Sequence, residues 1–331
     1  MPEISMIMPL FNKERYLSDA LESVMAQTFS DFELIIIDDG SDDHGLEIAK
    51  AYAERDTRFR VYSIENQGVS HARNMGMACA EGKYITFMDA DDTIHPSFIE
   101  NMYTCFLKNQ TDIVISGMIK HRDGVVRGEM ACSRTGLYPM EDILTDFASE
   151  QKRCGIFGSC VAKLFSREFA KGIRFDEKLN LAEDFDFYLR LYAKAKMVYC
   201  DDKLYYYYRQ EAENSSVQVA DEQIDYFGQL QISLRYRQFL NEKEAYWGVN
   251  KEIVSEQITN YLFLSLYYCP QENFTDRFNA LRMICHTQKL ELLPRGVRQN
   301  VVLLLFRWNM CTMLRCMISG YHAIRRRMRR A

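Results

Sequence analysis

The sequence predicts an α/β fold with a mostly parallel central sheet, followed by a helical C-terminal extension. Short apolar runs alternate with segments of helical periodicity up to residue 116, and from about residue 221 onward the pattern is helical with little strand character. Strands that alternate with helices imply a parallel sheet covered by helices on both faces. With 331 residues, 47% of them hydrophobic, the chain can form one large domain and a smaller one.

The expected strands are short apolar runs, as is typical of strands buried on both faces. They cover residues 4–8, 32–37, 60–64, 84–88 and 112–116. The segments between them are expected to be helices, and the first has an apolar stripe at helical spacing. These helices cover residues 16–27, 46–53, 71–80 and 97–108.

The pattern loosens after the fifth strand, from residue 117 to residue 179. One further helix is expected from Glu183, and an aromatic strand at residues 204–208. A polar stretch then marks a domain boundary. We therefore expect two domains, residues 1–217 and residues 218–331.

Polar and acidic residues directly follow three of the expected strands. Phe11 and Asn12 come after the first strand. Asp38 and Asp39 come after the second, and residues 89–92 follow the fourth. Ligands of open α/β sheets bind beyond the carboxyl ends of the strands. The sequence therefore predicts a binding site at this edge of the sheet.

Asp89, Asp91 and Asp92 form the densest acidic cluster. Carboxylate oxygens suit Mg²⁺ or Mn²⁺, and Mg²⁺ is commonly held by one or two carboxylates together with substrate phosphates. An isolated Asp-x-Asp is more often a solvated loop or a helix cap, but the preceding strand and the other clusters favour a metal site. For Asp39 the alternative is an ordinary turn, with Asp39 or Ser41 capping the next helix.

Two further segments carry candidate chemistry. Gly68 and Ser70 precede a helix whose amides could attract phosphate, and Arg73 adds positive charge; the alternative is a capped helix with a surface arginine. Glu183 and Asp184 open another helix. They either complement the helix dipole or supply a general base that takes the proton of an attacking hydroxyl.

Eight motifs follow one another along residues 3–217. They read MPLFN at 8–12, QTF at 27–29, DDGSD at 38–42, GVSHARN at 68–74, GKYITFMDADD at 82–92, ED at 183–184, YYR at 207–209 and SS at 215–216. In this order they resemble glycosyltransferase family 2. The resemblance implies a GT-A fold and the transfer of a sugar, with inversion, from a nucleotide diphosphate donor, expected to be a UDP-sugar, to an acceptor hydroxyl.

The resemblance also implies roles for residues of these motifs. Asp91 would bind Mn²⁺ or Mg²⁺, with Asp92 as a second ligand, and Asp184 would be the catalytic base with Glu183 beside it. Pro9 and Phe11 would flank the nucleotide base, although Phe11 lacks the hydroxyl of the tyrosine that is commoner there. The nucleotide-sugar set implied by the motifs is Pro9, Phe11, Asn12, Asp39, Arg73, Asp89, Arg209 and Ser215.

The end of the chain is strongly basic. After Glu291 it contains nine arginines and no lysine, aspartate or glutamate, so the last 40 residues have a formal charge of +9. Because the whole chain has a net charge of −5, residues 1–291 have a charge of −14. The apolar run at residues 301–306 is interrupted soon afterwards by Arg307 and Arg315, which argues against a membrane-spanning helix. It predicts either a helix packed on the first domain or an interfacial helix on anionic lipid, which would suit a glycan or lipid-linked glycan acceptor.

Other functions fit the sequence less well. Nucleotidyl transfer is the rival enzyme class, but the first strand is not followed by a Gly-rich loop bearing Lys or Arg. A binding module without activity would be expected to have lost Asp39, Asp91 or Asp184, and no nucleic-acid motif accompanies the basic tail. Ten cysteines without a Cys-x-x-Cys pair, and no evident signal peptide, predict a cytoplasmic protein. The basic tail at residues 295–331 predicts that it lies on the inner face of the cytoplasmic membrane.

Overall fold

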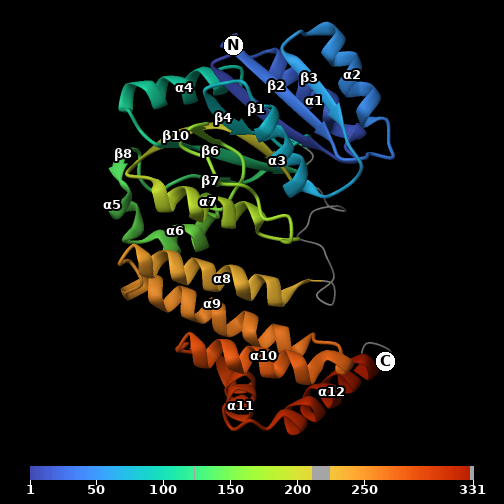
Figure 1. Cartoon of the computed structure of the whole chain (residues 1–331), viewed down its shortest axis with the longest axis vertical. Helices are drawn as coiled ribbons and strands as arrows, with labels where there is room; N and C mark the ends of the chain where they lie inside the picture. The colour runs from blue at the N-terminus through green and yellow to red at the C-terminus, as the bar shows by residue number, and fades with distance from the viewer. Residues whose placement is uncertain (123, 211–223, 329–331) are drawn as a thin grey trace. The chain divides into compact units, whose positions relative to one another are not determined.

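The chain consists of two compact units, Met1–Gln218 and Val219–Ala331. The structure, a computed structural model, describes residues 1–122, 124–210 and 224–328 (Figure 1). The expected domain boundary at residues 217 and 218 and the candidate site residue Ser215 lie outside the described residues.

The first unit is built on one large sheet. Its strands follow the order β3–β2–β1–β4–β9–β6–β10–β5, with β7 paired to β6 and β8 paired to β10. The strands are β1 (Ile4–Leu10), β2 (Phe32–Asp38), β3 (Phe59–Ser63), β4 (Tyr84–Phe87), β5 (Thr93–Ile94), β6 (Ile113–Arg122), β7 (Val125–Met130), β8 (Gly136–Pro139), β9 (Lys163–Ser166) and β10 (Met197–Arg209).

The first four strands form the parallel half of the sheet. Strand β1 pairs in parallel with β2 on one side and with β4 on the other, and β2 pairs in parallel with β3. The chain thus builds outward from β1 to β3 and then returns to the far side of β1. The strand order reverses between β1 and β4, and a crevice that can bind ligands is expected outside the carboxyl ends of such strands.

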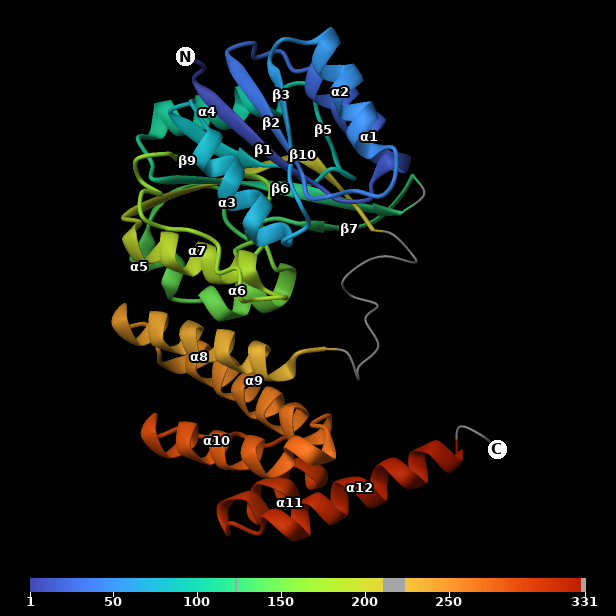
Figure 2. The same cartoon turned by 45° about the vertical axis from the view of Figure 1, so that its right-hand side comes forward.

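Helices cover both faces of this sheet. Helices α1, α2 and α4 lie on one face, and α3 and α7 lie on the other (Figure 2). Helix α1 buries Leu17, Ala20, Leu21 and Val24 of the predicted apolar stripe, and the fifth residue of the stripe, Met25, is half-buried. The helices of this unit are α1 (Glu14–Met25), α2 (Gly45–Arg55), α3 (Val69–Cys79), α4 (Phe98–Asn109), α5 (Met140–Leu144), α6 (Phe147–Cys154) and α7 (Glu183–Lys194).

The segment from residue 117 to residue 179, where the sequence pattern loosened, adds antiparallel structure. Strand β9 runs antiparallel to both β4 and β6, and β7 forms a hairpin with β6. The aromatic strand expected at residues 204–208 is the second half of β10, which pairs in parallel with β6. The sheet is therefore parallel from β3 to β4 and mixed beyond it.

An aromatic cluster joins this mixed half to α7. The rings of Phe175 and Phe187 stack with centroids 4.2 Å apart, and both meet the ring of Phe87 edge-on. Phe87 is the last residue of β4, and Phe187 lies in the second turn of α7. Aromatic pairs of this kind contribute about 0.5–1.5 kcal/mol beyond their area burial. The cluster fixes the start of α7 near the end of β4.

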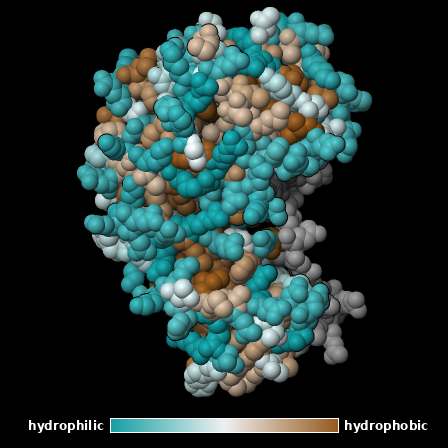
Figure 3. Space-filling model, in the orientation of Figure 1, coloured by the Kyte–Doolittle hydropathy of each residue, from teal (hydrophilic) through white to brown (hydrophobic). Residues whose placement is uncertain are grey.

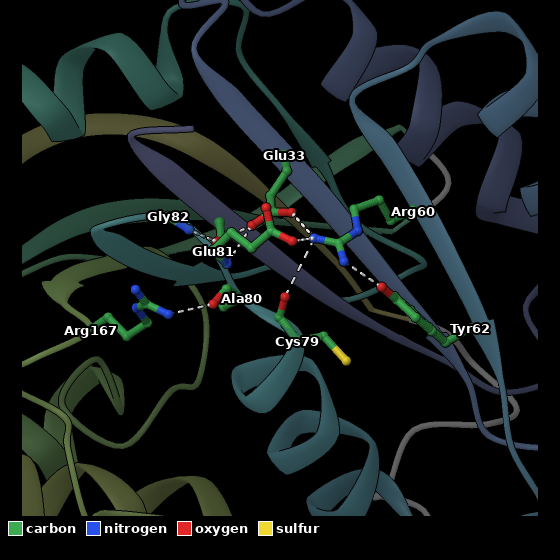
Figure 4. A network of polar contacts seen from close by, with 9 residues as sticks. Glu33, Arg60, Tyr62, Cys79, Ala80, Glu81, Gly82 and Arg167 are labelled. Carbon is green, nitrogen blue, oxygen red and sulfur yellow. Dashed lines mark hydrogen bonds and ion pairs between the residues drawn. The ribbon is translucent and has the colours of Figure 1, made fainter. Parts of the chain in front are cut away.

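A buried polar network ties the amino ends of β1 and β2 together (Figure 4). The Glu33 carboxylate accepts hydrogen bonds from the Ser5 hydroxyl at 2.6 Å and from the Arg60 guanidinium at 2.7 Å. Burial alone would raise the pKa of Glu33, but hydrogen bonds from Ser5, Glu81 and Arg60 hold it below its ordinary value. This network lies at the opposite ends of β1 and β2 from the acidic clusters, so it supports the sheet rather than the site.

The second unit is helical in its described residues. It contains α8 (Tyr226–Glu242), α9 (Gly248–Tyr267), the 3₁₀ turn η3 (Gln271–Asn273), α10 (Phe274–Thr287), α11 (Gly296–Arg307) and α12 (Cys311–Met328). Among the described residues, no helix combines the length and the apolar character needed to cross a bilayer. The face seen in Figure 1 carries mostly hydrophilic residues with smaller apolar patches between them (Figure 3).

Candidate functional site

A pocket of about 550 Å³ lies at the carboxyl ends of β1 and β4, where the strand order reverses. Six residues of the expected nucleotide-sugar and metal sets line it: Pro9, Phe11, Asp39, Asp89, Asp91 and Arg209. The other lining residues are Leu10, Lys13, Asn66, Gly68, Val69, Ala72, Ala90 and Tyr208. The structure therefore brings five separate segments of the chain together at one cavity.

The loop after β1 presents an aromatic ring to this pocket. Phe11 is 44% exposed although it is large and apolar, which leaves its face available to a planar group. Asn12 beside it has φ of 52°, in the left-handed region that asparagine tolerates. Its side chain accepts a hydrogen bond from the amide of Asp42, and its amide donates to the Ser41 hydroxyl. Asn12 thus fixes the loop that carries Phe11 and does not itself line the pocket.

Asp39 has both carboxylate oxygens engaged with a neighbouring loop. They accept hydrogen bonds from the amides of Gln67 and Gly68, each at 2.8 Å. Asp39 is buried, and these bonds hold the loop that leads into α3 against the pocket. The amides of Gln67 and Gly68, directly before α3, are therefore occupied by Asp39. Gly40 must be glycine here, since its φ is 72° and a Cβ would lie 2.9 Å from the amide nitrogen of Asn66.

The end of β10 holds residues 89–92 in place, and we call these residues the acidic turn. The Tyr206 hydroxyl donates to Asp92 Oδ2 at 2.6 Å, and the Arg209 amide donates to Asp92 Oδ1 at 2.7 Å. The Asp89 amide in turn donates to the Tyr206 hydroxyl, and Arg209 Nε donates to the Asp91 carbonyl. Asp92 is fully buried, and this burial raises its pKa well above the ordinary value. Both carboxylate oxygens of Asp92 are thus used to hold the end of β10, which argues against its predicted role as a metal ligand.

Asp91 points into the pocket and meets a cation there. Its Oδ2 lies 2.5 Å from the ammonium nitrogen of Lys13, and both side chains are largely buried. Lys13 lies between β1 and α1, so this ion pair joins the loop after β1 to the loop after β4. The sequence reading did not single out Lys13. Its position directly after the MPLFN motif was the signal that could have found it.

The residues at this turn fit a hard divalent cation. Asp89 and Asp91 both line the pocket and offer carboxylate oxygens, and the Lys13 ammonium stands where positive charge is favoured. Across the described residues, His, Cys, Asp and Glu form no cluster of three or more arranged to hold a metal ion. A site with two protein carboxylates suits Mg²⁺ or Mn²⁺ only with further oxygens from water or substrate phosphates.

Arg73, which we expected to contact the donor, is buried and is not among the residues that line the pocket. Its Nη1 lies 2.8 Å from Glu183 Oε1, and its Nη2 lies 3.3 Å from Asp89 Oδ1. The fold brings Asp89 and Glu183, which are far apart in sequence, together around this guanidinium, and contact of Arg73 with the donor stays a prediction. Arg73 Nε is buried and has no hydrogen-bond partner among the described residues. Arg73 therefore links the acidic turn to the start of α7.

The start of α7 presents Glu183 and Asp184 under local backbone strain. The preceding residue, Ala182, has φ of 62°, which is uncommon for alanine. Burial, and next the neighbouring Glu183 carboxylate, raise the pKa of Asp184 to about 7, although Arg73 opposes this rise. A carboxyl group with this pKa can exchange protons near neutral pH, as a general base requires.

Tyr208 is a further aromatic residue of the pocket, which it lines from β10. Burial, followed by the charges of four carboxylates, raises its pKa to about 12. Those carboxylates belong to Asp92, Asp89, Asp91 and Asp184. Asp184 does not line the pocket itself, but it lies within electrostatic reach of the same tyrosine as the acidic turn. The sequence reading used Tyr208 only as part of a motif, and Tyr206 not at all.

Comparisons with known proteins agree with this architecture. The glycosyl transferase family 2 profile matches residues 5–170. The glycosyltransferase EpsJ of Bacillus subtilis is 33% identical over 66% of this chain, which spans 64% of that protein. The minor teichoic acid biosynthesis protein GgaB of the same organism is 32% identical over 65% of this chain, which spans only 24% of GgaB.

A solved structure shares the fold across nearly the whole chain. Staphylococcus aureus TarS, residues 1–349 in complex with UDP-GlcNAc, superposes with a TM-score of 0.65 and 21% sequence identity. The alignment covers 98% of this chain and 92% of that one. The arrangement of a GT-A sheet followed by helices is therefore shared with a protein that binds a nucleotide sugar.

Proposed function

Because this chain belongs to glycosyl transferase family 2, we propose that it is an inverting, metal-dependent glycosyltransferase that uses a UDP-sugar donor. One observation carries the proposal beyond family membership: the pocket at the strand reversal gathers an exposed aromatic ring, two carboxylates and an arginine within reach of a carboxyl group poised near neutral pH. Each of these groups suits one part of a glycosyl diphosphate and its transfer.

The donor nucleotide would lie at the loop after β1. Phe11 would stack on the base, with Pro9 behind it, and Asn12 would keep this loop in place through Ser41 and Asp42. Asp39 would shape the nucleotide site by holding the backbone of Gln67 and Gly68, or it would replace one of these two hydrogen bonds with a hydrogen bond to the nucleotide base. Arg209 and Lys13 would meet the diphosphate, because both are cations that line the pocket.

Asp91 would bind Mn²⁺ or Mg²⁺, with Asp89 as the second carboxylate. When bound, such a cation neutralises the charge that develops on a departing diphosphate. We revise the role of Asp92, which would hold Tyr206 and Arg209 in position rather than contact the metal. Lys13 would give up Asp91 when the cation and donor arrive, and its ammonium would then be available to the phosphates.

Asp184 would take the proton of the acceptor hydroxyl as that oxygen attacks the anomeric carbon. An oxygen that attacks from the face opposite the departing diphosphate inverts the configuration, and no covalent enzyme intermediate is needed. Glu183 would not be the base, because its carboxylate is held by Arg73 at 2.8 Å. Arg73 would act as a positioning residue that holds the start of α7, which carries Asp184, next to the acidic turn.

The acceptor would be a glycan or a lipid-linked glycan in the synthesis of a surface polysaccharide. This part of the proposal rests on similarity to GgaB, a minor teichoic acid biosynthesis protein. The basic C-terminal region would bring the enzyme to the inner face of the cytoplasmic membrane. Nine arginines without an acidic residue after Glu291 support this location.

The test is donor hydrolysis by the purified full-length protein. A panel of UDP-, GDP- and TDP-sugars is incubated with Mn²⁺, and release of the nucleoside diphosphate is measured with and without excess chelator. We expect slow, chelator-sensitive hydrolysis of at least one UDP-sugar. Absence of both hydrolysis and thermal stabilisation by every nucleotide sugar would refute the proposal, and full activity in chelator would refute its metal dependence.

A further inference from the structure

Helix α11 is apolar on both of its faces. One face packs inside the helical unit and buries Val302, Leu303, Leu305 and Phe306. The opposite face exposes Val297, Val301 and Leu304, and Trp308 directly after the helix extends it. Arg298, Asn300 and Arg307 lie between these two faces, and an exposed apolar face of this kind marks an interaction surface. The outer face of α11 therefore requires a partner that no described residue supplies.

The exposed residues form a continuous stripe. Val297, Val301, Leu304 and Trp308 recur at steps of four, three and four, which places them on one side of the helix. Val297 is 80% exposed and Trp308 is 68% exposed, so the two ends of the stripe are nearly uncovered. Helix α12 packs beside α11, and Met310 just before it and Met313 and Met317 within it are each more than one-third exposed. Met317 lies beside the stripe, because it lines one pocket together with Val297 and Val301. We call these seven residues the α11–α12 face.

A pocket of about 610 Å³ opens in the same region of the helical unit. Val297, Val301 and Met317 of the α11–α12 face line it, together with the aromatic rings of Phe263 and Tyr321. Two arginines, Arg295 and Arg298, also line it. The Arg298 guanidinium lies 4.8 Å from the centre of the Tyr321 ring and donates to the Tyr321 hydroxyl at 2.8 Å. Apolar walls with cations beside them suit the boundary between acyl chains and phosphate headgroups.

The charge around this face is mainly positive. Arg298 and Arg307 are exposed on α11, the exposed Arg295 next to it is paired with Glu256 of α9, and no acidic residue follows Glu291 in the chain. Each basic residue near an anionic bilayer contributes attraction that salt screens, while buried apolar area contributes a part that salt does not screen. A second copy of this chain would bring the same arginines face to face, which disfavours self-association through this surface.

We propose that the α11–α12 face docks on an anionic lipid bilayer, with the stripe inserted among the lipids and the arginines on the headgroup phosphates. This inference deepens the membrane association proposed above, because it moves the contact from the terminal arginines to a defined surface. It does not depend on glycosyl transfer. Donor hydrolysis can therefore fail or succeed independently of docking.

The test is co-sedimentation of the full-length protein with phosphatidylglycerol vesicles and with phosphatidylcholine vesicles at low and high salt. We expect binding to phosphatidylglycerol that weakens but persists as salt rises, and little binding to phosphatidylcholine. The variant Val301→Ser/Leu304→Ser should lower the partition coefficient by about tenfold or more. The matched control is Val249→Ser/Leu107→Ser, which alters the same residue types at 40% and 49% exposure away from this face.

Trp308 supplies a second, independent measurement. The chain has two tryptophans, so Trp247→Phe leaves Trp308 as the only one. Its emission should shift to the blue when phosphatidylglycerol vesicles are added. Unchanged emission, or equal loss of binding in the control variant, would overturn the proposal. A blue shift that instead follows protein concentration without vesicles would also overturn it, since a second copy would then cover the face.

Discussion

Arg73 and Glu183, 110 residues apart in the sequence, form a buried ion pair with 2.8 Å between Nη1 and Oε1. The same guanidinium reaches Asp89 at 3.3 Å. One side chain thus joins the acidic turn of the pocket to the helix that carries the proposed base. Removing a single partner from a buried ion pair costs about 3–5 kcal/mol, because the remaining charges stay buried without compensation.

Arg73→Gln should therefore destabilise the protein by about that amount in denaturant unfolding. In the fraction that folds, transfer should become optimal at a higher pH, because Arg73 lowers the pKa of Asp184 against the effect of burial. Arg73→Lys, which keeps the charge but not the forked geometry, should recover part of the pH profile. The measurement is the pH dependence of transfer together with unfolding free energy.

The matched control is Arg60→Gln, which breaks a similar pair with Glu33 at 2.7 Å near the amino ends of the strands. It should reduce stability without moving the pH midpoint of transfer. If both variants leave the pH midpoint unchanged, Arg73 only stabilises the fold.

Asp184→Asn should abolish the proton-accepting step and leave donor binding within a few-fold of wild type. We expect transfer to fall by about 10²–10⁴-fold, the usual contribution of a general base. Wild-type transfer should rise with pH through about 7, because the ionised carboxylate is the active form and its pKa is raised to about 7. The exposed carboxylate Asp202 offers a control, since Asp202→Asn should keep this profile.

The raised pKa of Asp184 also predicts a stability effect. Between the ordinary carboxyl value and about 7 the native state binds more protons than the unfolded state, so stability falls as pH rises through this range. Asp184→Asn should therefore stabilise the protein by roughly 1–3 kcal/mol at pH 8 and by little near pH 4. Equal unfolding free energies of variant and wild type at pH 8 would show that burial does not destabilise the ionised form of Asp184.

The sequence predicted the parallel half of the fold because those strands are buried on both faces and read as plain apolar runs. Strand β2, for example, is buried at all seven positions. The antiparallel additions gave no such signal. Val125 and Val126 of β7 are 52% and 61% exposed, and β9 is four residues long. Short or exposed strands are specified by the neighbours they pair with, and these neighbours are distant in sequence.

The site was predicted at the level of segments rather than of individual side chains. Strand ends located the pocket, since carboxyl ends of parallel strands meet at one edge. The sequence could not separate Asp91 from Asp92, because adjacent carboxylates point in directions that only the turn geometry decides. Nor could it place Arg73, whose partners Asp89 and Glu183 lie on other elements. Long-range pairing of charges is set by the fold and leaves no local pattern.

Alanine at Asp91 and at Asp92 should therefore have opposite signatures. Asp91→Ala should abolish Mn²⁺-dependent UDP binding and lower the unfolding free energy only slightly, because its carboxylate faces the pocket. Asp92→Ala should destabilise the protein by about 2–4 kcal/mol, because it leaves the Tyr206 hydroxyl and the Arg209 amide without their acceptor. Calorimetric UDP titration and denaturant unfolding distinguish the two. A stable Asp92→Ala protein that has lost metal-dependent binding would restore Asp92 as a ligand.

Lys13→Met should change metal and nucleotide affinity in opposite directions. In the protein without donor, the Lys13 ammonium lies 2.5 Å from Asp91 Oδ2, so a divalent cation must displace it to reach this carboxylate. Removing the ammonium should tighten Mn²⁺ binding in the absence of nucleotide by about tenfold, which corresponds to about 1.4 kcal/mol. It should weaken UDP binding in the presence of saturating Mn²⁺, because the pocket loses a cation that could meet the diphosphate.

Mn²⁺ titration followed by electron paramagnetic resonance measures the first effect of Lys13→Met, and calorimetry measures the second. Lys50→Met, on the exposed side of α2, is the control and should change neither affinity. Mn²⁺ affinity that stays constant in Lys13→Met would mean that the ammonium and the metal do not compete for Asp91, and the metal would then have to be assigned to Asp89 alone.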